Sequence, residues 1–285
     1  MSTKPFGLLR KRLFRVLRVP QSFILSINKR QRFVLAVVFC ATLLFVSENL
    51  LGRSGFYVTF ILSLLSGFLF FLSVYTDVGE KRSLYVFILP IFLYTLSVGL
   101  FYFLIPPRFL SRLIITVLYA GGLYSLYLSQ NIHIISALRT IPLLSGARIV
   151  SFVTTFFSYF FLTAVLYSLT GTLVLPIYVT GLVLLMTSFL AVFQSMVISY
   201  EKSIRQSLVW SSVLSLCLLE VGVLLWFWPT TPTVVAIFLT GFFYTIVGIS
   251  HVWLEKRLFR GVIWEYVWVS VLMFAILIVS TSWQG

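Results

Sequence analysis

The sequence predicts an all-α polytopic transmembrane helix bundle of about nine spans, with its N-terminus inside the cell and its C-terminus outside. Hydrophobic residues make up 60% of the 285 positions and charged residues only 10%. A soluble domain is typically about 45–50% apolar and about 25% charged. The apolar residues fall into nine long runs, and the basic residues gather at alternate ends of these runs.

Each apolar run approaches the roughly 20 residues that a helix needs to cross the hydrocarbon core. Backbone groups find no hydrogen-bond partner in lipid, so the runs must be helices or strands of a closed barrel. Their length and uniform hydrophobicity favour helices, because barrel strands are shorter and alternate. The predicted spans are residues 33–51, 56–75, 84–105, 109–129, 149–170, 173–198, 208–228, 233–253 and 262–281.

A basic segment, residues 1–32, precedes the first span and contains nine basic residues and no acid. Between residues 6 and 19 the apolar side chains share one helical face. Such a helix is expected to lie at the cytoplasmic interface and to bind anionic lipid headgroups. A disordered tail and a nucleic-acid arm are the alternatives, but the placement of basic residues beside spans argues against nucleic acid as a partner. The predicted headgroup ligands are Lys11, Arg12, Arg15 and Arg18.

Residues 33–285 form the predicted nine-helix transmembrane domain, which a connector at residues 130–148 divides into four spans and five. The connector is expected to be a short amphipathic helix in the bilayer interface, ended by Pro142. His133 and Arg139 fall on its polar side. The connector is then either a hydrated elbow between two spans or a gate or headgroup contact built on these two residues.

The basic residues also predict the orientation. With nine spans, 18 of the 21 lysines and arginines lie on the side of the N-terminus and three on the other side. Lysine and arginine are enriched in cytoplasmic loops. We therefore expect a multi-pass protein of a cell membrane, a prokaryotic cytoplasmic one, with the N-terminus in the cytoplasm.

Glu220 is the main ionisable candidate inside a span, because a carboxylate in hydrocarbon is costly unless it is protonated, paired or hydrated. Its expected partner is Arg112 in the fourth span, and Glu48 near the outer end of the first span is placed in the same cluster. A structural pair, a carboxylate that couples protons or substrate, and a catalytic acid are the roles considered. Gln194 in the sixth span is expected to form an interhelical hydrogen bond.

His251 and Glu255 stand four residues apart at the inner end of the eighth span, a spacing that allows a local pair. Two residues do not make a metal site, since a catalytic zinc ion normally has three protein ligands. The sequence contains no HExxH, GxSxG or CxxC motif and no phosphate-binding glycine-rich loop. Neither a metal nor another cofactor is therefore predicted.

These observations favour a non-enzymatic membrane protein. It is expected to bind or pass a small or lipid-like molecule, or to be a membrane-embedded component of a homo- or hetero-oligomeric assembly. The alternative is a membrane enzyme that acts on a lipid or lipid-linked substrate at the inner interface, with His251, Glu255, His133 and Arg139 converging there. A transporter should have a hydrated midplane cavity near Glu220.

Overall fold

The computed structural model describes residues 28–50, 55–74, 85–106, 108–136, 144–173, 176–199, 204–257 and 259–281. Within these ranges the chain is all-helical and contains no strand. The predicted fold class is therefore confirmed. The predicted headgroup ligands in residues 1–27 lie outside the described residues, as do Arg139 and the side chain of Glu48.

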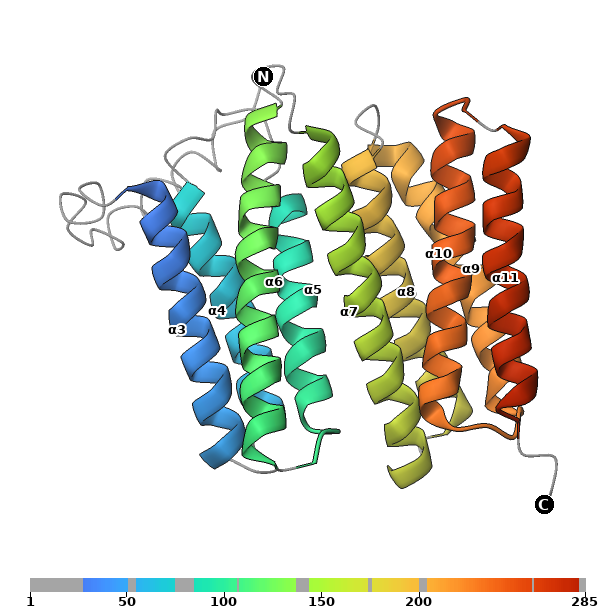
Figure 1. The fold of residues 1–285 in the computed structure, drawn as a ribbon, viewed down its shortest axis with the longest axis horizontal. Coiled ribbons are helices and arrows are strands. Elements are labelled where there is room, and N and C mark those ends of the chain that lie inside the picture. The colour runs from blue at the N-terminus through green and yellow to red at the C-terminus, as the bar shows by residue number, and fades with distance from the viewer. Residues whose placement is uncertain are drawn as a thin grey trace, which may run out of the picture.

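The described helices follow the predicted spans one by one (Figure 1). They are α3 (Lys29–Leu50), α4 (Gly55–Val74), α5 (Tyr85–Tyr102), α6 (Phe109–Ser136), α7 (Leu144–Leu173), α8 (Ile177–Ser199), α9 (Ile204–Trp226), α10 (Pro232–Leu254) and α11 (Arg260–Val279). Eight of them are long and apolar enough to cross a membrane, and α5 contributes a shorter apolar stretch, Val86–Tyr102. The chain is thus a multi-pass membrane protein.

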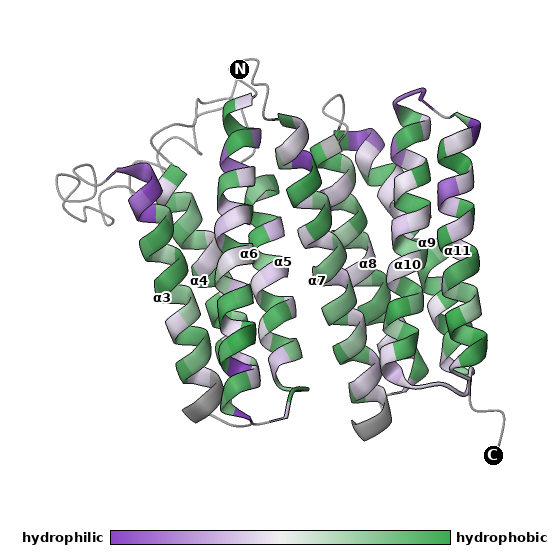
Figure 2. Ribbon diagram, viewed as in Figure 1, coloured by the Kyte–Doolittle hydropathy of each residue, from purple (hydrophilic) through white to green (hydrophobic). Residues whose placement is uncertain are grey.

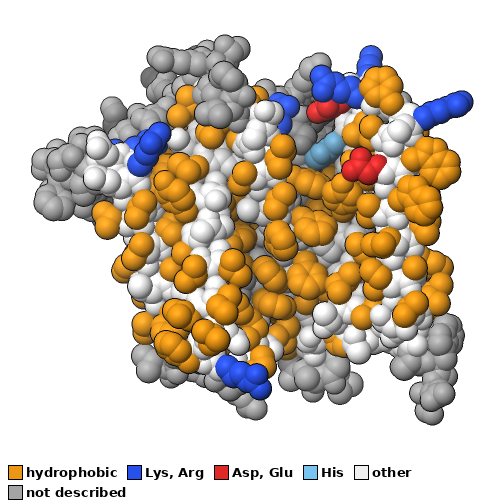
Figure 3. All heavy atoms as spheres, in the orientation of Figure 1, with side chains coloured by type: hydrophobic (Ala, Val, Ile, Leu, Met, Phe, Trp, Pro, Cys, Tyr) orange, Lys and Arg blue, Asp and Glu red, His pale blue; other side chains and the backbone are white. Residues whose placement is uncertain are grey.

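Successive helices alternate in direction, so α3 begins at one face of the bundle and α11 ends at the other (Figure 1). Hydrophobic residues dominate the middle of the helices, and hydrophilic ones concentrate at the face where α3 begins (Figure 2). We call this the charged face, because eight of the ten described basic residues lie there: Lys29, Arg30, Arg32, Arg148, Arg205, Lys256, Arg257 and Arg260. Figure 3 shows Lys and Arg side chains along this face. The other two, Arg108 and Arg112, lie at the opposite face.

Two clusters of buried hydrophobic side chains form the core, one in each half of the bundle. The first comes from α3 to α6, where the ring of Tyr127 packs against Phe33 and Phe70. The second comes from α7 to α11, where Tyr159 stacks on Phe243 with ring centroids 4.7 Å apart. Because lipid tails are as apolar as these side chains, close packing rather than escape from water holds such helices together.

Buried hydroxyl groups link the helices within each half. In the first half, the Tyr127 hydroxyl donates to the Ser66 carbonyl at 2.7 Å, and Ser66 Oγ lies 3.0 Å from Thr95 Oγ1. In the second half, the Tyr167 hydroxyl donates to the Gly222 carbonyl at 2.8 Å. Polar contacts of this kind join transmembrane helices because hydrocarbon offers no alternative partner.

The helix α6, which corresponds to the fourth predicted span, is longer than predicted. α6 has 28 residues and ends at Ser136, and α7 begins at Leu144. Residues 130–136 therefore continue the span and do not start a separate interfacial helix, while residues 137–143 lie outside the described residues. The physical reason is the polar face of Gln130 and His133, which is buried against α7 and not exposed to water.

The last helix is attached to the bundle along a narrow strip. α11 packs mainly on α10, and Leu277 is its one buried residue. Its close approach depends on two glycines of α10, because a Cβ atom at Gly241 would overlap Met273 and one at Gly248 would overlap Tyr266.

Candidate functional site

A buried hydrogen-bond network, here called the α6/α7 seam, joins α6 to α7 near the charged face. Ser129 Oγ donates to the Ala147 carbonyl at 2.7 Å and lies 2.7 Å from Ser151 Oγ. The Gln130 amide nitrogen Nε2 donates to Ser151 Oγ at 3.1 Å, and His133 Nε2 lies 3.3 Å from the same oxygen. One small hydroxyl on α7 thus anchors three side chains of α6, which holds the two helices close together at this level.

The polar contacts continue from α7 to α8 and α10. Thr155 Oγ1 donates to the Ser151 carbonyl at 2.7 Å, and Gln194 Nε2 donates to Thr155 Oγ1 at 2.5 Å. Gln194 therefore forms the interhelical hydrogen bond that the sequence predicts. One residue further along α8, Ser195 Oγ lies 3.4 Å from His251 Nε2.

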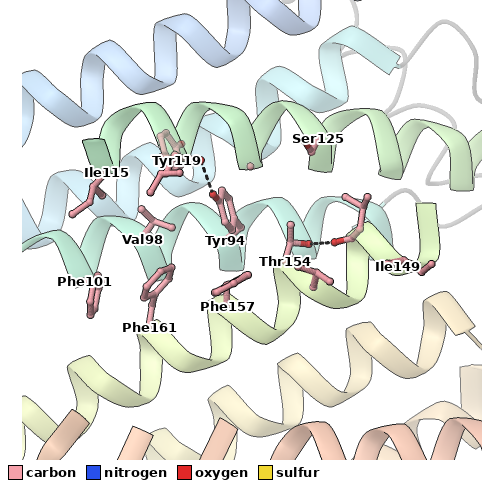
Figure 4. Close-up of a pocket in the computed structure, with 14 residues that line it drawn as sticks. Tyr94, Val98, Phe101, Ile115, Tyr119, Ser125, Ile149, Thr154, Phe157 and Phe161 are labelled. Atoms are coloured by element: carbon pink, nitrogen blue, oxygen red, sulfur yellow. Dashed lines mark hydrogen bonds between the residues drawn. The ribbon is translucent and has the colours of Figure 1, made fainter. Parts of the chain in front are cut away.

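Away from the charged face α6 and α7 diverge (Figure 1), and an apolar hollow opens between them. We call this hollow the α6/α7 groove. Its volume is about 460 Å³, and its floor is α5. Figure 4 shows the lining side chains, which come from all three helices: Tyr94, Val98 and Phe101 of α5; Ile115, Leu118, Tyr119, Gly122 and Ser125 of α6; and Ile149, Val150, Val153, Thr154, Phe157 and Phe161 of α7.

Aromatic rings shape the deep end of the groove. The rings of Phe101 and Phe161 lie with centroids 4.5 Å apart, so α5 and α7 close the groove there. Phe157, one turn before Phe161, has its ring centroid 6.4 Å from that ring and is 48% exposed. These rings form an apolar wall beside α7.

The few polar groups of the groove are hydrogen-bonded within the protein, and the Tyr119 hydroxyl donates to Thr95 Oγ1 at 3.2 Å. Ser125 Oγ donates to the Gly121 carbonyl and Thr154 Oγ1 to the Val150 carbonyl, each at 2.9 Å. Tyr94 donates across to the Leu118 carbonyl of α6 at 3.4 Å. No aspartate, glutamate, lysine, arginine or histidine lines the groove. An apolar ligand therefore suits it, because the groove offers no charge to recognise a polar one.

The structure does not bring Glu220 and Arg112 together. Glu220 lies on the exposed surface of α9, which packs mainly on α8 and α10. The Arg112 guanidinium carbon lies 5.7 Å from the centroid of the Tyr102 ring, on α5. Glu220 forms no ion pair with any described residue and lines none of the cavities described here. The predicted pair is replaced by an arginine packed on an aromatic ring and a glutamate that faces outward.

His251 and Glu255 also point to different partners. Glu255 Oε2 lies 3.8 Å from the Arg257 guanidinium, in the turn between α10 and α11. His251 contacts Ser195, and its ring centroid lies 6.1 Å from that of Phe152. Among the described residues no group of three histidine, cysteine, aspartate or glutamate side chains is placed to hold a metal ion.

Sequence reasoning did not identify the groove. Its lining residues are ordinary apolar residues of three spans, with no motif to mark them. The one local signal is Gly122, because a Cβ atom there would overlap the Tyr94 hydroxyl. A glycine in a span indicates close helix approach, but it does not say that an open hollow adjoins the contact.

The fold and the groove together define a helical multi-pass membrane protein with an apolar intramembrane hollow. Residues 78–280 match the model of a family described as "Protein of unknown function (DUF5656)". The match covers more than half of the chain, so the chain belongs to this family. A search of curated proteins and a search of solved structures found no match. The matched range contains α5, α6 and α7, and so the whole groove, but neither α3 nor α4.

Proposed function

We propose that this protein binds the hydrocarbon chain of a membrane lipid or lipid-like molecule in the α6/α7 groove. The observation that carries the proposal is the hollow of about 460 Å³ between three helices. Ligand pockets in proteins typically have volumes of about 300–1,000 Å³ and predominantly apolar walls. The groove meets both conditions, and its surroundings in the membrane are rich in molecules of this chemistry.

The shape of the groove favours a chain over a compact ligand. Lining residues extend along α7 from Ile149 to Phe161, which is 12 residues or about 18 Å along the helix axis. The hydrocarbon core of a bilayer is about 30 Å thick. The groove is therefore long enough to hold a substantial part of one extended acyl or isoprenoid chain parallel to the helices.

The chemistry beside the groove favours binding over catalysis. A membrane enzyme at this interface would need its acids and bases to converge on one point. Instead His133 bonds within the α6/α7 seam, and Glu255 is paired with Arg257. The groove itself supplies no nucleophile with an adjacent base.

We also place the charged face in the cytoplasm of a cell membrane, on the basis of the positive-inside rule.

Photo-crosslinking tests the proposal directly. The purified protein in nanodiscs is labelled with a phospholipid that carries a diazirine at the end of one acyl chain, and the labelled peptides are mapped by mass spectrometry. We expect more photolabelling at the groove-lining positions of α6 and α7 than at the lipid-facing positions of α11. Even labelling of all exposed apolar positions would refute binding in the groove.

A matched pair of variants sharpens the result. Val153 of α7 lines the groove and is 42% exposed, and Val267 of α11 is 41% exposed but lines none of the cavities described here. Val153→Trp should fill the groove and remove most of its labelling, while Val267→Trp should leave that labelling unchanged. Equal effects of the two substitutions would contradict the proposal.

A further inference from the structure

A second hollow, which we call the α3/α4 groove, lies between α3 and α4 in the first half of the bundle. Its volume is about 560 Å³. It lies outside the range matched by the family model and shares no lining residue with the α6/α7 groove. Its lining residues are Arg32, Leu35, Ala36, Val38, Phe39 and Thr42 of α3 with Leu69, Leu72 and Ser73 of α4.

One cation stands at the end of this groove that meets the charged face. Arg32 is in the first turn of α3, and its Nε and Nη1 atoms are inaccessible to water. Neither atom has a hydrogen-bond partner among the described residues. Buried N–H groups without partners are unfavourable, because the lost hydration is not replaced by other hydrogen bonds. The position therefore favours a ligand that supplies acceptor oxygens.

Below Arg32 the groove is apolar. Thr42 is its deepest member on α3, ten residues or about 15 Å along the axis from Arg32. This depth equals about one leaflet of a 30 Å hydrocarbon core. The hydroxyls of Thr42 and Ser73 donate to carbonyl groups of their own helices, at 2.9 and 2.8 Å. Arg32 is thus the one charged group of the site.

We propose that the α3/α4 groove is a specific site for an anionic phospholipid of the leaflet at the charged face. The phosphate would accept hydrogen bonds from Arg32 after a rotamer change that turns the guanidinium into the groove, since the planar guanidinium matches phosphate oxygens in a bidentate manner. One acyl chain would lie over Ala36, which is small and buried, between the exposed side chains of Leu35 and Phe39. The headgroup would thus lie beside Arg32 at the membrane surface, and the acyl chain would lie in the apolar part of the groove within the bilayer.

The first test compares two lipids on the unmodified protein. Nanodiscs are prepared with photoreactive phosphatidylglycerol or with photoreactive phosphatidylcholine of the same chains, and crosslinks to α3 and α4 are quantified. Both lipids carry a phosphate, but the trimethylammonium group of phosphatidylcholine makes its headgroup neutral and would lie near the Arg32 guanidinium. The net charge of the headgroup therefore predicts a preference for phosphatidylglycerol of about fivefold. Equal labelling by the two lipids would overturn the proposal without any need for a variant. Inorganic phosphate should not compete, because it has no chain to fill the groove; competition would identify a free-anion site instead.

Variants then assign the preference to one residue. Arg32→Gln should lower phosphatidylglycerol labelling of α3 and α4 to the level of phosphatidylcholine, and Arg32→Lys should retain part of the preference. Arg30→Gln is the matched control, because Arg30 is exposed and does not line the groove. Loss of the preference in the Arg30 variant as well would show a diffuse surface potential and would refute the site. Labelling of the α6/α7 groove should not change in any of these variants, so the two proposals fail independently.

Discussion

The hydroxyl group of Tyr94 occupies the space that the side chain of residue 122 would fill. Gly122 lies on α6 and Tyr94 on α5, and a Cβ atom at position 122 would overlap the Tyr94 hydroxyl and ring. The tyrosine hydroxyl can therefore reach the Leu118 carbonyl of α6. This contact sets the distance between the floor and one wall of the α6/α7 groove.

Gly122→Ala is expected to destabilise the protein by about 1–3 kcal/mol, the usual cost of an added methyl group in a close-packed interior. The neighbouring glycine provides the control, because a Cβ atom at Gly121 would meet no atom within 4 Å. Gly121→Ala should change stability by less than about 0.5 kcal/mol. Thermal melting in detergent measures both, and equal losses would contradict the close contact.

Gln194 and Thr155 should be energetically coupled. Gln194→Leu and Thr155→Val each remove one partner of the buried bond between α8 and α7. In membrane proteins such interhelical bonds contribute about 0.6–2 kcal/mol. A double-mutant cycle on unfolding in mixed micelles should therefore yield a coupling in this range. Additive losses would show that the two side chains do not depend on each other.

Glu220→Gln and Arg112→Gln should have additive effects. Glu220 is exposed on α9 and the Arg112 side chain packs over the Tyr102 ring, so the two residues share no partner. Independent sites add within about 0.3–0.5 kcal/mol. The measurement is the melting temperature of both single variants and the double variant in detergent. A coupling energy well above that limit would support the ion pair between Glu220 and Arg112 that the sequence suggested.

The orientation of the bundle can be measured by cysteine labelling. Arg257 lies in the turn between α10 and α11 at the charged face, and Phe227 lies just after α9 at the opposite face; both are exposed. In a chain without its two native cysteines, Arg257→Cys should resist a membrane-impermeant maleimide added to intact cells, and Phe227→Cys should react. The reverse pattern would invert the topology expected from the positive-inside rule.

The sequence predicts the helices well because the bilayer fixes their length. Eight of the nine described helices are long and apolar enough to cross the membrane and the ninth, α5, is a shorter apolar helix, so composition alone located them. The end of α6 is the exception. In the sequence, the polar residues Gln130 and His133 suggest a hydrated interface. In the structure, both side chains are buried and bond to Ser151 of α7. Hydropathy does not distinguish a polar residue in water from one buried against a neighbouring helix.

The α6/α7 groove and the exposure of Glu220 depend on how each helix is rotated about its own axis. The sequence contains no pattern that predicts this rotation. α5, α7 and α11 are apolar around most of their circumference, so no amphipathic stripe shows which side of Val153 or Phe157 meets a neighbour. Glu220 was expected to face a partner inside the bundle. The packing of α9 instead turns it outward, and only the contacts of the whole assembly determine that choice.

The division of the core into two clusters bears on how the chain matures during synthesis. The first cluster draws its buried members from α3 to α6 alone, which are consecutive in the chain. Chains emerge from the ribosome N-terminus first, and units formed from neighbouring segments can assemble early. The helices α3 to α6 therefore have all the buried members of their own hydrophobic cluster before α7 to α11 are translated, and α7 to α11 then join a scaffold that already exists.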